Sequence, residues 1–237
     1  GAPAGDLIAW VYALMPAPLI LGFWNFESVV AFLILLSVRL LINQQAARAG
    51  GVIALGALTK LLPLVLIGTA WRFLSRPAAL RATVLSGAIT TLGLAAVLWF
   101  APRYGGVSLT AQFNKASFQT VWALIDRNYI TGTFSNDRFD PAEASALRGN
   151  PAVIPTWLRL AIFGGLGVFV FLTTRRQDAR GIVAFGAITL IIVYLWSSGW
   201  STQWQAALIP LILLALPDRN GVMCVLALSA FSFFEYP

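Results

Sequence analysis

The chain has 237 residues, of which 59% are hydrophobic and 11% charged, with a formal net charge of +7 and a mean hydropathy of +0.80. Because soluble globular domains carry roughly 25% charged residues, this composition excludes an ordinary soluble domain and predicts an all-α integral membrane protein. The sequence has no His and one Cys, which excludes histidine-ligated haem, chlorophyll or zinc and any internal disulfide. Excess Arg is typical of the cytoplasmic loops of membrane proteins, so the positive net charge does not indicate a nucleic-acid partner. We also expect no metal or cofactor.

Long apolar runs follow one another along the chain, separated by short polar turns. About 20 apolar residues are enough to cross a bilayer, and the runs predict a polytopic bundle of about seven to nine membrane segments. We expect them to form a single transmembrane domain over 1–237, with one long loop, 102–156, that contains short helices outside the membrane. The expected segments are 7–24, 28–42, 50–72, 82–101, 157–174, 181–196, 204–216 and 221–234.

Two arginine-rich loops indicate the orientation. The loops 72–81 and 175–180 each hold three Arg, and loops of this kind lie on the cytoplasmic side of a membrane. One helix out and one helix back separate them, so the loop 102–156 and the turn 197–203 are expected on the extracytoplasmic side. These features predict a multi-pass protein of the cytoplasmic (inner) membrane, in contact with membrane lipids.

The segment 50–72 is apolar except for Lys60, and Pro63 follows three residues later. A charge is costly within a bilayer, and Pro removes a backbone N–H. If the segment crosses once, Arg39 and Arg48 lie outside, against the orientation rule. If it turns near Lys60, each half has about 10 residues and spans roughly 15 Å, and all basic ends lie inside. We favour this broken, re-entrant hairpin over a spanning helix whose lysine reaches back to one surface.

The extracytoplasmic loop is predicted to carry two short helices. Apolar positions in 111–125 recur at helical spacing, which is typical of an amphipathic helix at a membrane surface. Asp140 is placed to cap a second helix that ends at Gly149. The neighbouring residues Asp126 and Arg127 either form a local ion pair or face a sugar phosphate.

Three stretches stand in order along the chain. The first, MPAPLILGFWNFESVVAFLILLSVRL, is a pair of helices joined at a polar tip that includes Glu27. The second, GGVIALGALTKLLPLVLI, is a small-residue run followed by a T-K-x-x-P core at Thr59, Lys60 and Pro63. The third, SSGWSTQWQAALIPLILLALP, ends in an apolar run that contains Pro210.

Together these stretches resemble the polyprenyl-phosphate-dependent glycosyltransferases of the GT-C fold, in the alpha-mannosyltransferase-like branch of bacterial membrane proteins. In the third stretch Ser201, Gln203 and Pro210 match, whereas Thr202 stands where Pro is usual and Trp204 where Tyr is usual. The resemblance implies a lipid-linked donor, such as polyprenyl-phosphate mannose, and an acceptor on the extracytoplasmic side. The chain resembles the later part of such a fold, without its N-terminal helices. The family's catalytic carboxylate would then lie upstream of Gly1, and no catalytic residue is assigned.

The chemistry of such a transfer points to candidate site residues. The lipid phosphate leaves as an anion, which a cation in a poorly solvated site stabilises strongly. Lys60 suits this role, with Arg103 and Lys115 as further lipid-phosphate ligands. The residues expected to line the substrate are Glu27, Gln119, Ser201, Gln203 and Trp204.

Two other functions stay open from the sequence. One is a non-catalytic scaffold derived from the GT-C fold, which packs against other membrane subunits of a larger complex. The other is a transporter with a discontinuous helix at Lys60, since broken helices also build transport sites. The sequence specifies neither the sugar nor the acceptor.

Overall fold

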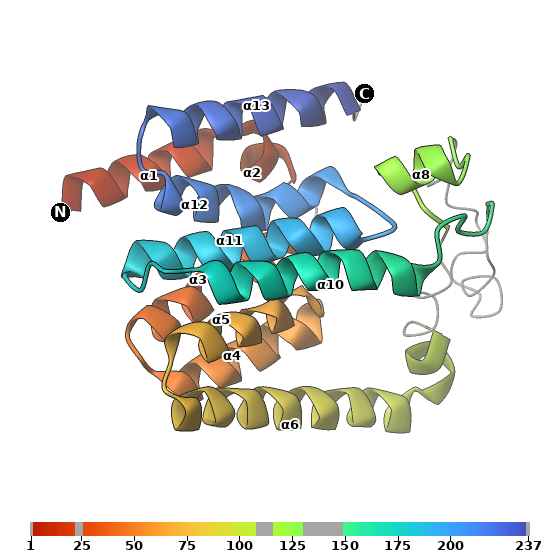
Figure 1. Ribbon diagram of the computed structural model, residues 1–237, viewed down its shortest axis with the longest axis horizontal. Coiled ribbons are helices and arrows are strands. Elements are labelled where there is room, and N and C mark those ends of the chain that lie inside the picture. Colours follow the sequence, from red (N-terminus) through yellow and green to blue (C-terminus); the bar gives the residue numbers. More distant parts are fainter. Residues whose placement is uncertain (1, 22–25, 108–115, 130–148, 236–237) are drawn as a thin grey trace. The chain divides into compact units, whose positions relative to one another are not determined.

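The computed structural model describes residues 2–21, 26–107, 116–129 and 149–235. These residues are almost entirely helical, and one isolated bridge is the only β-type pairing among them (Figure 1). The all-α prediction is therefore confirmed for the described part of the chain. Among these described residues, three helices are long and apolar enough to cross a membrane: α6 (Arg76–Phe100), α10 (Thr156–Thr173) and α11 (Ala179–Trp196).

The chain divides into two compact units. The larger unit comprises 1–90, 168–191 and 202–237, and the loop unit comprises 91–167 and 192–201. The other elements of the larger unit are α1 (Ala2–Leu14), α2 (Pro16–Leu21), α3 (Glu27–Ile42), α4 (Ala46–Thr59), η1 (Leu62–Val65), α5 (Leu66–Phe73), η3 (Thr202–Trp204), α12 (Gln205–Ala215) and α13 (Arg219–Glu235).

The core of the larger unit is built on α12, which packs against α3, α1 and α13. Every residue of α12 except Leu214 is buried. A helix that is apolar all round belongs in the interior, and α12 has this composition. Around it, α3 buries Val30, Ile34 and Leu41 completely.

Pro210 lies inside α12 and has no N–H for the carbonyl of Ala206, four residues earlier. The hydroxyl of Tyr12 on α1 donates to this carbonyl at 3.2 Å. Proline is tolerated within apolar helices where a neighbouring group satisfies the freed carbonyl. This hydrogen bond explains why α12 continues through Pro210, and it also holds α1 against α12.

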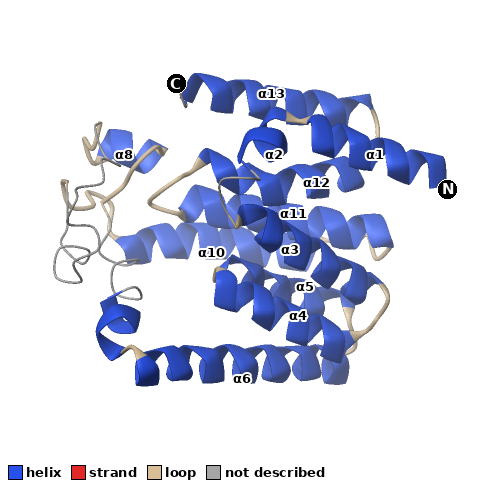
Figure 2. Ribbon diagram, turned by 180° about the vertical axis from the view of Figure 1, so that it is seen from behind, coloured by secondary structure: helices blue, strands red, loops and turns tan. Residues whose placement is uncertain are grey.

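The segment that contains Lys60 is a broken hairpin. α4 runs to Thr59, the short 3₁₀ helix η1 follows, and α5 returns beside α4 in both views (Figures 1 and 2). A side chain at Gly56 would meet the ring of Pro63 at 2.8 Å, and one at Gly50 would meet the carbonyl oxygen of Ala82 at 2.6 Å. These two glycines allow η1 to fold back on α4, and the start of α4 to lie against α6.

The loop unit contains α8 (Val121–Ile125), which is shorter than the predicted helix over 111–125. Residues 116–120, the described residues directly before it, are not helical. Thr120 is extended, and its hydroxyl caps α8 by accepting from the Ala123 N–H at 3.3 Å. Phe118 forms the isolated bridge with Gly199, which fixes this segment to the chain after α11. The second predicted helix begins at Asp140 and lies outside the described residues, apart from its expected end.

Candidate functional site

Lys60 occupies the break between α4 and η1. Its backbone is extended, with φ −159° and ψ 132°, and its N–H still donates to the Gly56 carbonyl at 2.9 Å. Pro63 cannot donate to the carbonyl of Thr59, so an α-helix cannot continue through this point. The local sequence thus ends α4 and places the lysine side chain at a helix terminus.

The Lys60 ammonium contacts an acid and an aromatic ring in the larger unit. Its Nζ lies 2.5 Å from Glu27 Oε1 and 4.4 Å from the centre of the Trp204 ring. The Glu27 side chain is 1% exposed, whereas the Lys60 side chain is 23% exposed. The pair is therefore buried on its acidic side and open to solvent or ligand on its basic side.

Both charges stand at favourable helix ends. Glu27 is the first residue of α3, where the positive end of the helix dipole stabilises a carboxylate. Lys60 directly follows α4, where the negative end of that dipole stabilises a cation. This arrangement lowers the cost of holding an ion pair among apolar helices.

The cluster retains unused hydrogen-bonding capacity. Glu27 Oε2 is buried and has no hydrogen-bond partner within the described residues. A lysine ammonium carries three N–H donors, and Glu27 accepts one of them. An anion beside Lys60 and a sugar ring against Trp204 would both find complementary groups here.

The other predicted site residues are distributed over both units. Gln203 precedes Trp204 in η3 of the larger unit and is half-buried. Arg103 and Gln119 are exposed in the loop unit, which also contains the half-buried Ser201. Lys115 lies outside the described residues. The structure thus brings Lys60, Glu27 and Trp204 into one cluster and does not assign the remaining candidates to it.

A buried polar network organises the loop unit. Asp126 accepts hydrogen bonds from the Ser117 hydroxyl at 2.7 Å and the Val153 N–H at 2.8 Å. It also forms a buried ion pair with Arg159 at 3.2 Å, and Arg159 stacks on Trp122 with 4.5 Å between the guanidinium carbon and the ring centre. Of the two alternatives for Asp126 and Arg127, the structure does not form the local ion pair, because the partner of Asp126 is Arg159, 33 residues further along.

The electrostatic state of Asp126 follows from these contacts. Burial alone would raise the pKa of its carboxyl group. The hydrogen bonds from Ser117 and Val153 and the positive charge of Arg159 act in the opposite direction and outweigh burial, so the pKa of Asp126 lies below its usual range. Asp126 is thus a charged structural anchor at neutral pH.

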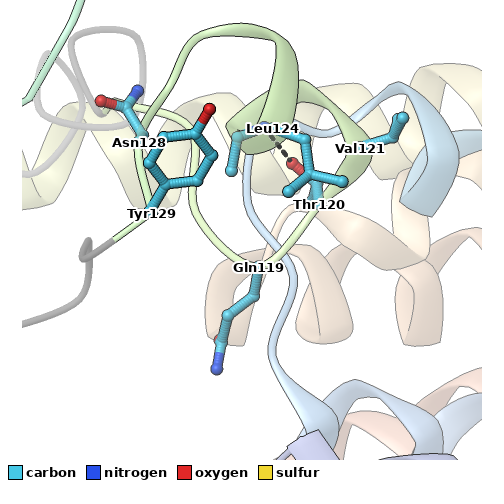
Figure 3. A pocket seen from close by; sticks show the side chains of 7 residues that line it. Gln119, Thr120, Val121, Leu124, Asn128 and Tyr129 are labelled. Atoms are coloured by element: carbon cyan, nitrogen blue, oxygen red, sulfur yellow. Dashed lines mark hydrogen bonds between the residues drawn. The ribbon is translucent and has the colours of Figure 1, made fainter.

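The loop unit also contains an open pocket of about 430 Å³ (Figure 3). Gln119 stands at its edge with a left-handed backbone, φ 50°, and the ring of Tyr129 lies beside Leu124. None of the lining residues is charged, so the pocket offers no counter-charge to a phosphate. The lining residues are Gln119, Thr120, Val121, Ala123, Leu124, Asn128 and Tyr129.

Among the described residues no three His, Cys, Asp or Glu side chains come together, and no metal centre is assigned there. Comparisons with protein-family models, with curated proteins and with solved structures gave no match.

Proposed function

We propose that the Lys60–Glu27–Trp204 cluster binds a polyprenyl-phosphate-linked sugar, and that the protein transfers this mannose-like sugar to an acceptor. The observation that carries the proposal is the partly exposed cation held at a helix break between a buried carboxylate and an indole ring. The resemblance of the T-K-x-x-P core to GT-C glycosyltransferases points the same way, since this core supplies Lys60.

The three side chains have separate roles in this proposal. In the transfer, the bond between the sugar C1 and the phosphate oxygen breaks, and a bond from C1 to the acceptor oxygen forms. The phosphate leaves with the bonding electrons, and the Lys60 ammonium stabilises its new charge. Trp204 provides an aromatic face for the sugar ring, and Glu27 keeps the ammonium in place. We assign no residue of this chain as the base that removes the acceptor proton.

The membrane setting is part of the same proposal. The shorter apolar helices join α6, α10 and α11 in a bundle of about seven to nine membrane segments, with the hairpin of α4 and α5 re-entrant. α4 has 14 residues, which is roughly 21 Å at 1.5 Å per residue. Lys60 then lies toward the extracytoplasmic side of the inner membrane, where the lipid-linked sugar is consumed.

The test compares donor binding between the purified wild-type chain and a paired substitution. Lys60→Met together with Glu27→Gln removes the cation without leaving a buried charge unpaired. We expect this double variant to bind polyprenyl-phosphate mannose about 10- to 100-fold more weakly, from about 1.5 to 3 kcal/mol for a hydrogen bond to a charged group. Arg48→Gln, which removes one exposed positive charge at the opposite end of α4, is the matched control and should bind normally.

The same experiment can contradict the proposal in two ways. A wild-type chain that binds polyprenyl-phosphate mannose no better than unphosphorylated polyprenol would exclude a phosphate site. A double variant that is folded and still binds the donor as the wild type does would exclude the Lys60 cluster as that site.

A transporter is a second candidate, because the interruption between α4 and η1 is the kind of discontinuous helix that builds transport sites. In liposomes, a transporter would move the lipid-linked or free sugar across the bilayer without forming a glycoside. Glycoside formation without net movement of the sugar would favour the transferase.

A further inference from the structure

Four turns of the larger unit that are rich in arginine lie at one end of it, opposite the end at which α4 stops at Lys60. The turns between α3 and α4, α5 and α6, α10 and α11, and α12 and α13 all lie at this end, on the left in Figure 1. Asp178 and Asp218 are the acidic residues in these four turns. The arginines in or beside the turns are Arg39, Arg48, Arg72, Arg76, Arg81, Arg175, Arg176, Arg180 and Arg219.

Direct contacts hold these turns together. Arg72 at the end of α5 donates a hydrogen bond to the carbonyl of Thr174, which follows α10. Arg180 at the start of α11 donates to the carbonyl of Ala215 at 2.5 Å, at the end of α12. These two contacts join the turns after α5, α10 and α12 into one surface, which brings together arginines that are distant in the sequence.

The densest part of this surface is the pair of turns after α5 and after α10, here called the arginine rim. It comprises Arg72, Arg76, Arg81, Arg175, Arg176 and Arg180. Asp178 is the acid within it and pairs with Arg176 at 3.0 Å, but the two side chains are 52% and 60% exposed. Such an exposed pair is screened by water and contributes little. The rim thus carries an uncompensated positive charge.

Apolar side chains continue directly from the rim along the helices. On α6, Leu80 and Val84 are exposed next to Arg81, and on α10, Leu172 is 71% exposed just before the turn. A ligand that fits both features has an anionic group at the end of the helices and hydrocarbon along their sides. This combination describes a phospholipid and does not suit a water-soluble anion or a nucleic acid.

We propose that the arginine rim is a binding site for the headgroups of anionic phospholipids. The exposed guanidinium groups of Arg76, Arg81 and Arg175 bind the phosphodiester through paired N–H donors, which match phosphate oxygens in geometry and charge. Arg72 and Arg180 add positive charge while they donate to backbone carbonyls. The acyl chains lie against the exposed faces of α6 and α10. The rim would hold one end of the larger unit in a leaflet that contains anionic lipids. It would thereby fix how deep Lys60, at the opposite end, lies in the bilayer.

The test uses the purified full chain in a non-ionic detergent after removal of bound lipid. Phosphatidylglycerol and phosphatidylcholine with the same acyl chains are titrated, and the bound lipids are counted by native mass spectrometry. We expect tighter binding of phosphatidylglycerol by the wild type, and weaker binding as the salt concentration rises.

A matched pair of double variants locates the site. Arg76→Gln with Arg175→Gln removes two exposed rim charges, and should weaken phosphatidylglycerol binding by about 30-fold, from about 1 kcal/mol per arginine. Arg48→Gln with Arg219→Gln removes the same charge from the two turns outside the rim, and should weaken it by less than about threefold.

Three outcomes would overturn the proposal. The first is equal binding of phosphatidylglycerol and phosphatidylcholine by the wild type. The second is an equal loss in the two double variants, which would mean diffuse attraction by the whole end of the unit. The third is binding of glycerol phosphate as tight as that of phosphatidylglycerol, which would indicate a site for a soluble anion.

Discussion

The ion pair of Lys60 and Glu27 should respond unequally to the loss of either partner. Lys60→Met leaves a carboxylate that is 1% exposed without its counter-charge, and removal of one partner of a buried pair costs about 3 to 5 kcal/mol. Glu27→Gln leaves an ammonium that is 23% exposed and still lies over the Trp204 ring. We expect that variant to lose about 1 to 2 kcal/mol, since water and the amide oxygen satisfy the cation.

The double variant separates the pair interaction from the packing of the side chains. Neutral groups of similar size leave no buried charge. The free energy of unfolding of the double variant Lys60→Met with Glu27→Gln should therefore lie within about 1 kcal/mol of the wild-type value. The double-mutant cycle then gives a coupling free energy of about 5 kcal/mol. Lys60→Ala is a poor probe of function for the same reason, because it lowers the yield of folded protein as well as removing the cation.

The unfolding free energy can be measured in mixed micelles of a non-ionic detergent and sodium dodecyl sulfate. The chain has nine Trp, so its intrinsic fluorescence reports the transition. A double variant as unstable as Lys60→Met would refute the reasoning, since the buried carboxylate would not be the source of the loss. Equal losses from the two single variants would refute the argument from unequal burial.

Two further predictions concern the packing of each unit. Asp126→Asn should destabilise the loop unit by about 2 to 4 kcal/mol at pH 7 through loss of the Arg159 pair. Because the pKa of Asp126 is lowered on folding, its stabilisation is present above the unfolded pKa of about 4 and is lost as pH falls through the folded pKa. Acid unfolding should therefore be steeper in the wild type than in the variant, and parallel curves would contradict the assignment. Gly50→Ala should cost about 1 to 3 kcal/mol, since its methyl group would lie 2.6 Å from the backbone oxygen of Ala82. A methyl group at Gly51 would meet no atom within 4 Å, so Gly51→Ala should stabilise α4 by up to about 1 kcal/mol. Thermal unfolding measures both variants. Similar effects at the two glycines would argue against the packing of α4 on α6.

Most of the helices could be predicted from the sequence because hydropathy is a local property. The segments expected at 28–42 and 181–196 are α3 and α11, with ends displaced by no more than two residues. The interruption at Lys60 could also be predicted, since Pro63 ends an α-helix through its own covalent structure. The helix over 111–125 was overestimated because helical spacing continues through residues that instead cap α8 and pair with the chain near Gly199.

The candidate site could be predicted only in part. Separate arguments predict the three residues: Glu27 lies in a polar tip between two apolar segments, Lys60 is the charge within the segment 50–72, and Trp204 belongs to the third stretch that resembles the family. Their contact could not be predicted, because α3, α4 and η3 meet only when the bundle packs around α12. The sequence contains no signal that shows which acidic side chain pairs with which basic side chain when the two are far apart along the chain.

The sequence by itself determined that this chain is built from apolar helices, where one of them breaks, and which residues carry its few charges. These properties depend on composition, on proline geometry and on the cost of placing charge among apolar groups. The tertiary structure alone decided that Lys60 is held by the buried Glu27 and that Asp126 pairs with Arg159. It also decided that arginines from separate turns form one rim. Partners across helices are set by side-chain packing in three dimensions, which the order of residues does not specify.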